Sequence, residues 1–253
     1  MNHRPWPRCP HCRGLALDLG SVRTRAWLSD PDLIVDVPTA DGAARPVRRG
    51  AIVDPAGCAR LLRRLLGDRL TGAARPLAIV TAPVLDGIAY RAAARTALAA
   101  LRPHSVLTVP RARGIAVAAE AEPAGPLLVV DAGAQFTEVV LLCDGAVTDA
   151  RRTAVGTADL ESPAEPLAEA VASMVTAMLR QDRTPLTATA LRRGALLAGG
   201  GALDPRFAHR VGALLHAPPR VVGAPHTAAV RGAAKLLRAA HLHPSAAGSA
   251  PPS

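Results

Sequence analysis

Aromatic side chains are scarce in this 253-residue chain, which has two Trp, two Phe and one Tyr. Alanine, leucine and valine must therefore build the core, because hydrophobic residues make up 49% of the chain. Few aromatics also leave little surface for stacking on nucleic-acid bases. Charged residues make up only 20%, which is typical of a globular protein rather than a disordered one. The length allows one large domain or two smaller ones.

Lysine is almost absent, since Lys235 is the only one among 30 basic residues. Arginines carry the net charge of +10, and they are spread along the chain rather than clustered. This dispersed excess does not indicate a specific nucleic-acid surface. It leaves open a loose attraction to anionic lipid or nucleic acid.

Long apolar runs are also absent, and none approaches the roughly 18 to 20 residues that a membrane-spanning helix needs. The first fifteen residues contain no apolar stretch of signal-peptide length. We therefore expect a cytoplasmic protein, and we leave open an attachment to the inner face of the membrane. Trp6 is the only apolar anchor of the leader, which does not indicate an amphipathic membrane helix. Composition predicts a disordered leader over 1–13 and a disordered tail over 243–253.

Four cysteines are too few to indicate a disulfide framework. Cys9 and Cys12 form a Cys-x-x-Cys motif, which supports either redox chemistry or half a zinc site. His3 and His11 are candidates to complete a zinc site. However, no second cysteine pair follows, and the motif precedes the first expected strand. A disordered leader is therefore the preferred interpretation.

Strands and helices alternate along the chain in two cycles. Apolar runs and turn residues predict strands over 15–20, 25–28, 33–37, 76–83, 105–109, 126–133, 136–145, 146–153, 194–201 and 220–225. Helical periodicity and capping residues predict helices over 54–66, 86–101, 111–121, 164–181, 204–216 and 227–241. Because the two cycles open with similar strands, we expect two similar α/β halves that face each other.

Three glycine-containing turns are candidates for phosphate binding. Two apolar strands end in Asp-x-Gly, at Asp18 to Gly20 and at Asp131 to Gly133, and a third turn contains Gly199 to Gly201. Glycine lets a backbone approach a phosphate closely, so that its N–H groups can bind the oxygens. A neighbouring carboxylate can hold hydrated Mg²⁺. Each turn alone is more often simply a loop.

Taken in order, the three turns resemble a known set of motifs. LALDLGSVRTRAWL and LLVVDAGAQFTEVVLL resemble the two phosphate motifs of the superfamily of actin, sugar kinases and heat-shock chaperones. ALLAGGGALDPRF resembles its adenosine motif. Three further stretches resemble MreB and Mbl, the bacterial actin-like rod-shape-determining proteins: RPVRRGAIVDPAGCARLLRRLL, LAIVTAPVLDGIAYRAAARTALAAL and APHTAAVRGAAKLL. The resemblance covers residues 14–241.

The resemblance implies an actin-like (ribonuclease H-like) α/β fold with a nucleotide cleft between two subdomains. Residues 14–125, completed by 225–242, would form a subdomain like IA, and residues 126–224 one like IIA. The chain is short for this family. The spans 27–45 and 157–166 are too brief to hold the two outer subdomains, which supply protofilament contacts and part of the adenine pocket in the family.

The resemblance also implies ATP and Mg²⁺ as cofactors. Asp18 and Asp131 would hold the metal. The implied nucleotide-binding residues are Asp18, Gly20, Ser21, Asp131, Gly133, Thr137, Gly199, Gly200 and Gly201. Arg23 and Arg25 follow the first turn, where they would either pair with phosphates or form a solvated strand face.

The chain departs from the family at several of these positions. Ala134 and Gln135 replace glycines of the second phosphate motif, and Phe136 replaces a small polar residue. Pro110 and Arg111 stand where the family has its water-activating Glu, and an arginine cannot act as a general base. At most a weak ATPase is therefore expected.

The function favoured on these grounds is that of an actin-like cytoskeletal protein that binds ATP-Mg²⁺ and acts in cell shape or cell-wall synthesis. Its partners would be longer MreB-type relatives or cell-wall synthesis proteins, and self-assembly is left open. One alternative is a small-molecule kinase or another ATPase of the superfamily. The other is a structural remnant that binds no nucleotide.

Overall fold

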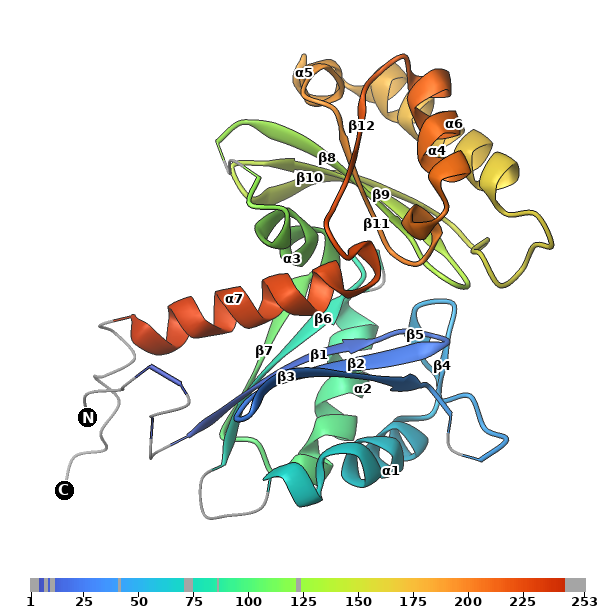
Figure 1. Cartoon of the computed structure of the whole chain (residues 1–253). Helices are drawn as coiled ribbons and strands as arrows, with labels where there is room; N and C mark the ends of the chain where they lie inside the picture. The colour runs from blue at the N-terminus through green and yellow to red at the C-terminus, as the bar shows by residue number, and fades with distance from the viewer. Residues whose placement is uncertain are drawn as a thin grey trace.

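Two five-stranded sheets form the centres of two lobes (Figure 1). The computed structural model describes residues 5–6, 9, 12–40, 42–70, 75–85, 87–121 and 124–243. The first sheet has the order β3-β2-β1-β6-β7. Its strands are β1 (Arg13–Leu19), β2 (Arg23–Ser29), β3 (Asp32–Pro38), β6 (Pro76–Ala82) and β7 (Ser105–Pro110). The second sheet has the equivalent order β10-β9-β8-β11-β12. Its strands are β8 (Pro126–Ala132), β9 (Thr137–Cys143), β10 (Ala146–Thr153), β11 (Ala195–Ala198) and β12 (Pro219–Val221).

Each sheet has three antiparallel strands followed by two parallel strands. The strand β1 pairs antiparallel with β2 and parallel with β6, and β8 likewise pairs with β9 and β11. The first strand of each sheet is therefore central and buried on both faces, which explains its continuous apolar run. The equivalent arrangement brings the carboxyl ends of β1 and β8 to the junction between the lobes.

Helices cover both faces of the first sheet. One face packs on α1 (Pro55–Leu66) and α2 (Gly87–Leu98), and the opposite face packs on α7 (Ala228–Leu242). The expected cap of the first helix is confirmed, because the side chain of Asp54 accepts a hydrogen bond from the backbone of Gly57 at 2.9 Å.

The second sheet is covered in the same way. One face carries α4 (Ala164–Gln181), α5 (Leu186–Arg192) and α6 (Pro205–Leu215). The opposite face carries α3 (Arg111–Ala118) and the start of α7. As expected, Asp204 caps α6, with its side chain accepting from the backbone of Arg206.

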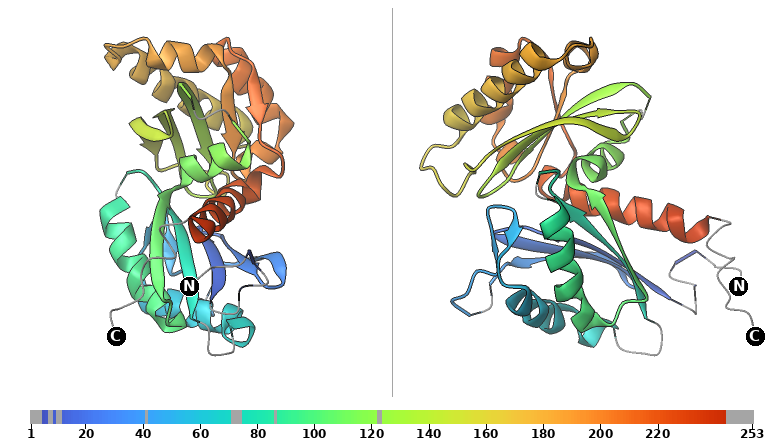
Figure 2. Two further views of the ribbon diagram at one scale, coloured as in Figure 1. Left: turned by 90° about the vertical axis from the view of Figure 1, so that its left-hand side faces the viewer. Right: turned by 180° about the vertical axis from the view of Figure 1, so that it is seen from behind.

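The helices α3 and α7 join the two lobes, and Figure 2 shows them crossing at the junction. Their close approach depends on two glycines. A Cβ on Gly232 would lie 1.7 Å from the carbonyl oxygen of Gly114, and a Cβ on Gly114 would lie 2.8 Å from that of Ala229. No larger residue fits this crossing without moving the backbone.

This architecture confirms the expected actin-like α/β fold class. The described strands and helices lie within a few residues of the predicted ones. Two features were not predicted: the short helix α5, and a two-stranded hairpin of β4 (Val47–Arg48) and β5 (Ala51–Ile52). Asp86, the expected cap of the second helix, lies outside the described residues.

In their described residues, the two spans expected to be too short for outer subdomains contain no helix or strand beyond those of the two lobes. Residues 27–45 contain the end of β2, strand β3 and a loop, and residues 157–166 contain a turn that enters α4. In the described part of the leader, Cys9 and Cys12 are buried and Arg13 begins β1. Among the described residues, no helix is long and apolar enough to span a membrane.

Candidate functional site

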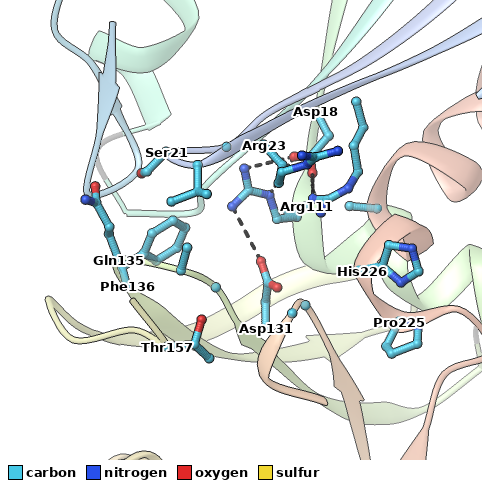
Figure 3. Close-up of a pocket in the computed structure, with 18 of the residues that line it drawn as sticks. Asp18, Ser21, Arg23, Arg111, Asp131, Gln135, Phe136, Thr157, Pro225 and His226 are labelled. Carbon is cyan, nitrogen blue, oxygen red and sulfur yellow. Dashed lines mark hydrogen bonds and ion pairs between the residues drawn. The ribbon is translucent and has the colours of Figure 1, made fainter. Parts of the chain in front are cut away.

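A cavity of about 220 Å³ lies between the lobes, at the carboxyl ends of β1 and β8 (Figure 3). The three predicted glycine turns meet there. Seven of the nine predicted nucleotide-binding residues line the cavity: Asp18, Gly20, Ser21, Asp131, Gly133, Gly199 and Gly200. We call this cavity the cleft.

Two predicted site residues do not line the cleft. Thr137, the first residue of β9, is buried, and its hydroxyl donates to the carbonyl oxygen of Val155 at 3.1 Å. Gly201 is buried behind the third turn, where it lines a neighbouring cavity with Thr157 and Phe207. These two residues lie behind the wall of the cleft and are not among the residues that line it.

Asp18 is the last buried polar residue of β1, and it is only 5% exposed. Its Oδ1 accepts from the hydroxyl of Thr81 at 2.7 Å and from Nε of Arg111 at 3.0 Å, while Oδ2 lies 3.7 Å from Arg25. Burial by itself raises the pKa of this carboxyl, but Arg111, Arg25 and the bond from Thr81 together hold the pKa below its usual value. Asp18 is therefore ionised in the folded protein.

Asp131 takes the equivalent position at the end of β8 and is 7% exposed. Its Oδ2 lies 3.5 Å from Nη1 of Arg111. The pKa of Asp131 is raised, whereas that of Asp18 is lowered. Burial raises the pKa of Asp131, and the nearby negative charge of Asp18 raises it further. Arg111 offsets this increase only in part. One cation thus holds two carboxylates that differ in acidity.

Arg111 begins α3 directly after Pro110, and it is 5% exposed. Figure 3 shows its guanidinium between the two carboxylates. Burial disfavours the charge, but Asp18 and Asp131 raise the pKa of Arg111 above its usual value. Its guanidinium also lies 5.4 Å from the ring centre of Phe136. Nη2 is 2.9 Å from Asp18, yet this buried atom has no acceptor at a hydrogen-bonding angle among the described residues.

Magnesium does not fit between the two carboxylates in this arrangement. The donor types suit the ion, because Mg²⁺ binds carboxylate oxygens. The guanidinium of Arg111, however, already contacts both Asp18 and Asp131. A dication there would have to displace this buried guanidinium, or else lie beside it at a high electrostatic cost.

Arg23 and Arg25 line the cleft but are committed to carboxylates. Both bind Asp36 on the neighbouring strand β3, with Nε–Oδ distances of 2.8 and 3.1 Å. Arg25 also lies close to Asp18. From the sequence, these two arginines would either pair with phosphates or form a solvated strand face. In the structure, both form ion pairs with aspartates along the wall of the cleft.

The two Asp-x-Gly turns present backbone donors to the cleft. Gly20 donates to the carbonyl of Arg23, and Gly133 donates to that of Phe136, both at 3.0 Å. These bonds tighten the turns. Within the described residues, none accepts a hydrogen bond from the backbone N–H of Ser21, Val22, Ala134 or Gln135. Such donors at a turn are suited to an anion.

His226 was not predicted as a site residue, although it lies in the APHTAAVRG stretch that carried part of the resemblance. It lines the cleft beside Pro225, and its Nδ1 is buried without a hydrogen-bond partner among the described residues (Figure 3). It lies in a short 3₁₀ turn (Pro225–Thr227) just before α7, and no local pattern predicts that its side chain reaches the cleft. An unpaired ring nitrogen in a cleft wall is a candidate ligand contact.

Two sets of contacts tie the lobes together around the cleft. The backbone of Arg49 donates to the side chain of Gln135 at 3.1 Å, and a Cβ on Gly50 would lie 3.0 Å from the ring of Phe136. The buried carboxylate of Glu138 accepts from the backbone of Val84 at 3.1 and 3.2 Å. Burial raises the pKa of Glu138. Glu138 therefore joins the lobes and is not among the residues that line the cleft.

Comparisons with known proteins bear on the fold. No family model and no curated protein matches the chain. Solved structures do match. MreB5 of Spiroplasma citri bound to ADP has a TM-score of 0.79 at 13% identity, over 91% of this chain and 97% of the other. The same protein bound to AMPPNP has a TM-score of 0.81 at 13% identity, over 90% and 97%. A MamK double helical filament has a TM-score of 0.66 at 14% identity, over 89% and 98%. At these identities the likeness concerns the fold alone: the chain has the actin-like fold of MreB and MamK.

Proposed function

We propose that this protein binds a nucleotide in the cleft without appreciable hydrolysis, with Arg111 as the resident cation. The observation that carries the proposal is the position of Arg111, which contacts both carboxylates and still has a buried nitrogen without a hydrogen-bond acceptor. A phosphate oxygen would accept from this nitrogen. ATP is the nucleotide we favour, because the similar MreB5 structures contain ADP and AMPPNP.

Other cleft groups support an anionic ligand. The unpaired backbone donors of both Asp-x-Gly turns line the cleft, and the glycines at 199 and 200 allow close approach from the second lobe. The buried Nδ1 of His226 supplies a further polar contact. Unpaired buried donors are costly, so a ligand that satisfies them gains affinity.

The same contacts lead us to expect slow hydrolysis of a bound nucleotide. Hydrolysis needs a base that activates water, and the position expected to supply one holds Arg111. Asp18 and Asp131 are the acidic residues in the cleft wall, and each contacts this cation. Glu138, whose carboxylate holds the backbone of the opposite lobe, is not available for this role. A kinase or ATPase of the same superfamily is therefore the less favoured alternative.

The cellular role we propose is that of an actin-like protein acting in cell shape or cell-wall synthesis. It would lie in the cytoplasm, with attachment to the inner membrane face as an open part of the proposal. The similar MamK structure is a filament, which supports self-assembly or joining the filaments of a longer relative. Because the described residues of 27–45 and 157–166 add no helix or strand beyond those of the two lobes, any filament of this chain alone would be weaker.

A specific observation favours the structural remnant as second candidate. The cleft volume of about 220 Å³ is smaller than the roughly 300–1,000 Å³ of most small-molecule sites. Phe136, in place of a small polar residue, lines the cleft together with Gln135. Nucleotide binding therefore requires the lobes to open or the ring of Phe136 to move.

Calorimetric titration with ATP, in Mg²⁺ and separately in EDTA, distinguishes these candidates. We expect binding in both buffers and no phosphate release in a coupled assay. Arg111→Lys, which keeps the charge but loses the fork of donors, should weaken binding, whereas the exposed control Arg206→Ala should not. Absence of binding in both buffers would support the remnant, and phosphate release at the rate of full-length relatives would support an ATPase.

A further inference from the structure

Two cysteines from the chain start and one histidine from the last helix converge at the far end of the first lobe from the cleft. Cys9, Cys12 and His241 are 8%, 6% and 3% exposed. One ligand atom from each lies within 4.8 Å of the others. The histidine is 229 positions from Cys12, so only the fold brings these residues together.

Two of the three ligand distances match those around one tetrahedral metal, and the third is within 4.8 Å. Sγ of Cys9 lies 3.7 Å from Sγ of Cys12, and the latter lies 3.7 Å from Nδ1 of His241. Zinc bonds of about 2.3 Å to sulfur and about 2.0–2.1 Å to nitrogen, at tetrahedral angles, place such atoms about 3.6–3.8 Å apart. A disulfide needs about 2.05 Å between its sulfur atoms, and neither cysteine forms one.

The surrounding side chains hold the three ligands in place. The ring of Trp6 stacks on that of His241, with centroids 3.9 Å apart and planes 7° from parallel. Nε1 of the same Trp6 donates to the carbonyl oxygen of Cys12 at 3.0 Å. One tryptophan thus orients the histidine ring and fixes the backbone of the Cys-x-x-Cys segment, as the outer partners of metal sites do.

We propose that Cys9, Cys12 and His241 bind one Zn²⁺ ion, which fastens the chain start to α7. Two thiolates and an imidazole are a donor set that suits zinc. Water or a further side chain completes the tetrahedron. His3 and His11, named as candidate ligands from the sequence, lie outside the described residues. The ion stabilises the first lobe by linking its first strand to its last helix, and this role is independent of the cleft.

Cobalt substitution tests the site directly, because Co²⁺ bound to thiolates in a tetrahedron has strong visible and near-ultraviolet bands. The full-length reduced protein, freed of metal, should develop these bands up to one equivalent of Co²⁺, and Zn²⁺ should abolish them. Cys12→Ser should lose the thiolate band, whereas the matched control Cys143→Ser should keep it. A wild-type protein with no such bands at excess Co²⁺, or an unchanged spectrum in Cys12→Ser, would overturn the proposal.

A second measurement keeps the proposal testable if Cys12→Ser fails to fold. Trp6→Phe keeps a stacking ring but loses the N–H donor, so it should weaken Zn²⁺ affinity about 10- to 100-fold in competition with a chromophoric chelator. Removing zinc from the wild type should also lower its melting temperature, and adding zinc back should restore it. Equal zinc affinity in Trp6→Phe and wild type, together with no thermal effect of the metal, would contradict the site.

Discussion

Nη2 of Arg111 lies 2.9 Å from Oδ1 of Asp18, although the two residues are 93 positions apart in the chain. Asp18 is the penultimate residue of β1, the central strand of the first sheet, while Arg111 begins the helix that leads to the second lobe. The same guanidinium contacts Asp131 on the second sheet. A single cation therefore joins the equivalent strands of both lobes at the place where the family resemblance implies a metal.

Removing this cation should destabilise the protein. Arg111→Ala leaves two buried carboxylates without their partner, and breaking a buried ion pair in this way costs about 3–5 kcal/mol. Arg111→Lys should cost less, because the charge is retained. The free energy of unfolding from urea denaturation measures both effects. The exposed control Arg206→Ala should leave the midpoint unchanged. Equal midpoints for wild type and Arg111→Ala would mean that the ion pair contributes nothing.

Reversing the charge should create a dependence on magnesium. Arg111→Glu places a third carboxylate beside Asp18 and Asp131, so the metal-free variant is destabilised by repulsion. Mg²⁺ should restore stability by about 2.7 kcal/mol at 100 times its dissociation constant. Thermal melting with increasing MgCl₂ measures this, with Arg111→Gln as the uncharged control. If Mg²⁺ shifts wild type and Arg111→Glu equally, the carboxylates do not form a metal site even without the arginine.

The crossing of α3 and α7 should not accept a methyl group. Gly232→Ala places a Cβ 1.7 Å from the carbonyl oxygen of Gly114, so we expect a loss of about 1–3 kcal/mol. In an unobstructed helix the same change stabilises by up to about 1 kcal/mol. Gly87→Ala is the matched control, because its Cβ would meet only Arg91 at 3.5 Å. A melting temperature of Gly232→Ala at or above that of wild type would show that the helices separate easily.

Acid should affect the two cleft aspartates in opposite ways. The pKa of Asp18 is below its ordinary value of 3.8, so its ionised form stabilises the fold above that pH. This contribution is lost as the pH falls through the lowered pKa. Asp18→Asn should therefore cost most stability above pH 3.8, and the difference from wild type should narrow in acid.

Asp131 has a raised pKa, and its ionisation costs the folded wild type stability as the pH rises from 3.8 through that pKa. Asp131→Asn removes this loss, so its stability relative to wild type should improve with increasing pH. Urea denaturation from about pH 3 to pH 7 measures both variants. Parallel pH profiles of the two variants would contradict the opposite shifts.

Local signals predicted most of the fold. Asp54 and Asp204 precede helical patterns, and both are N-caps, because capping depends on residues two or three positions away. The helix α5 was missed since its seven residues, after Pro185, carry too few turns for a periodic pattern. Strand β11 was predicted over 194–201, but it ends at Ala198, where the glycines begin.

Sequence patterns placed the glycine turns and the two aspartates in the cleft, but not the cation between them. Glycine turns are visible in a sequence, but the partners of Arg111 depend on contacts across 93 and 20 positions. From the sequence, Arg111 was notable only because it replaces a catalytic Glu of the family. In the structure, its guanidinium lies between the two aspartates of the cleft. His241 likewise joins Cys12 across 229 positions, so the Cys-x-x-Cys motif alone predicted only two of the three residues of the cluster.

We propose that a nucleotide binds beside the fixed guanidinium of Arg111 rather than through Mg²⁺, and that it is not hydrolysed. The most direct measurement is calorimetric titration of the full-length protein with ATP in EDTA, followed by quantification of the ATP that remains. We predict binding that does not require Mg²⁺, with the ATP recovered intact after addition of Mg²⁺. Binding that appears only with Mg²⁺, or ATP converted to ADP and phosphate at the rate of full-length relatives, would contradict the account.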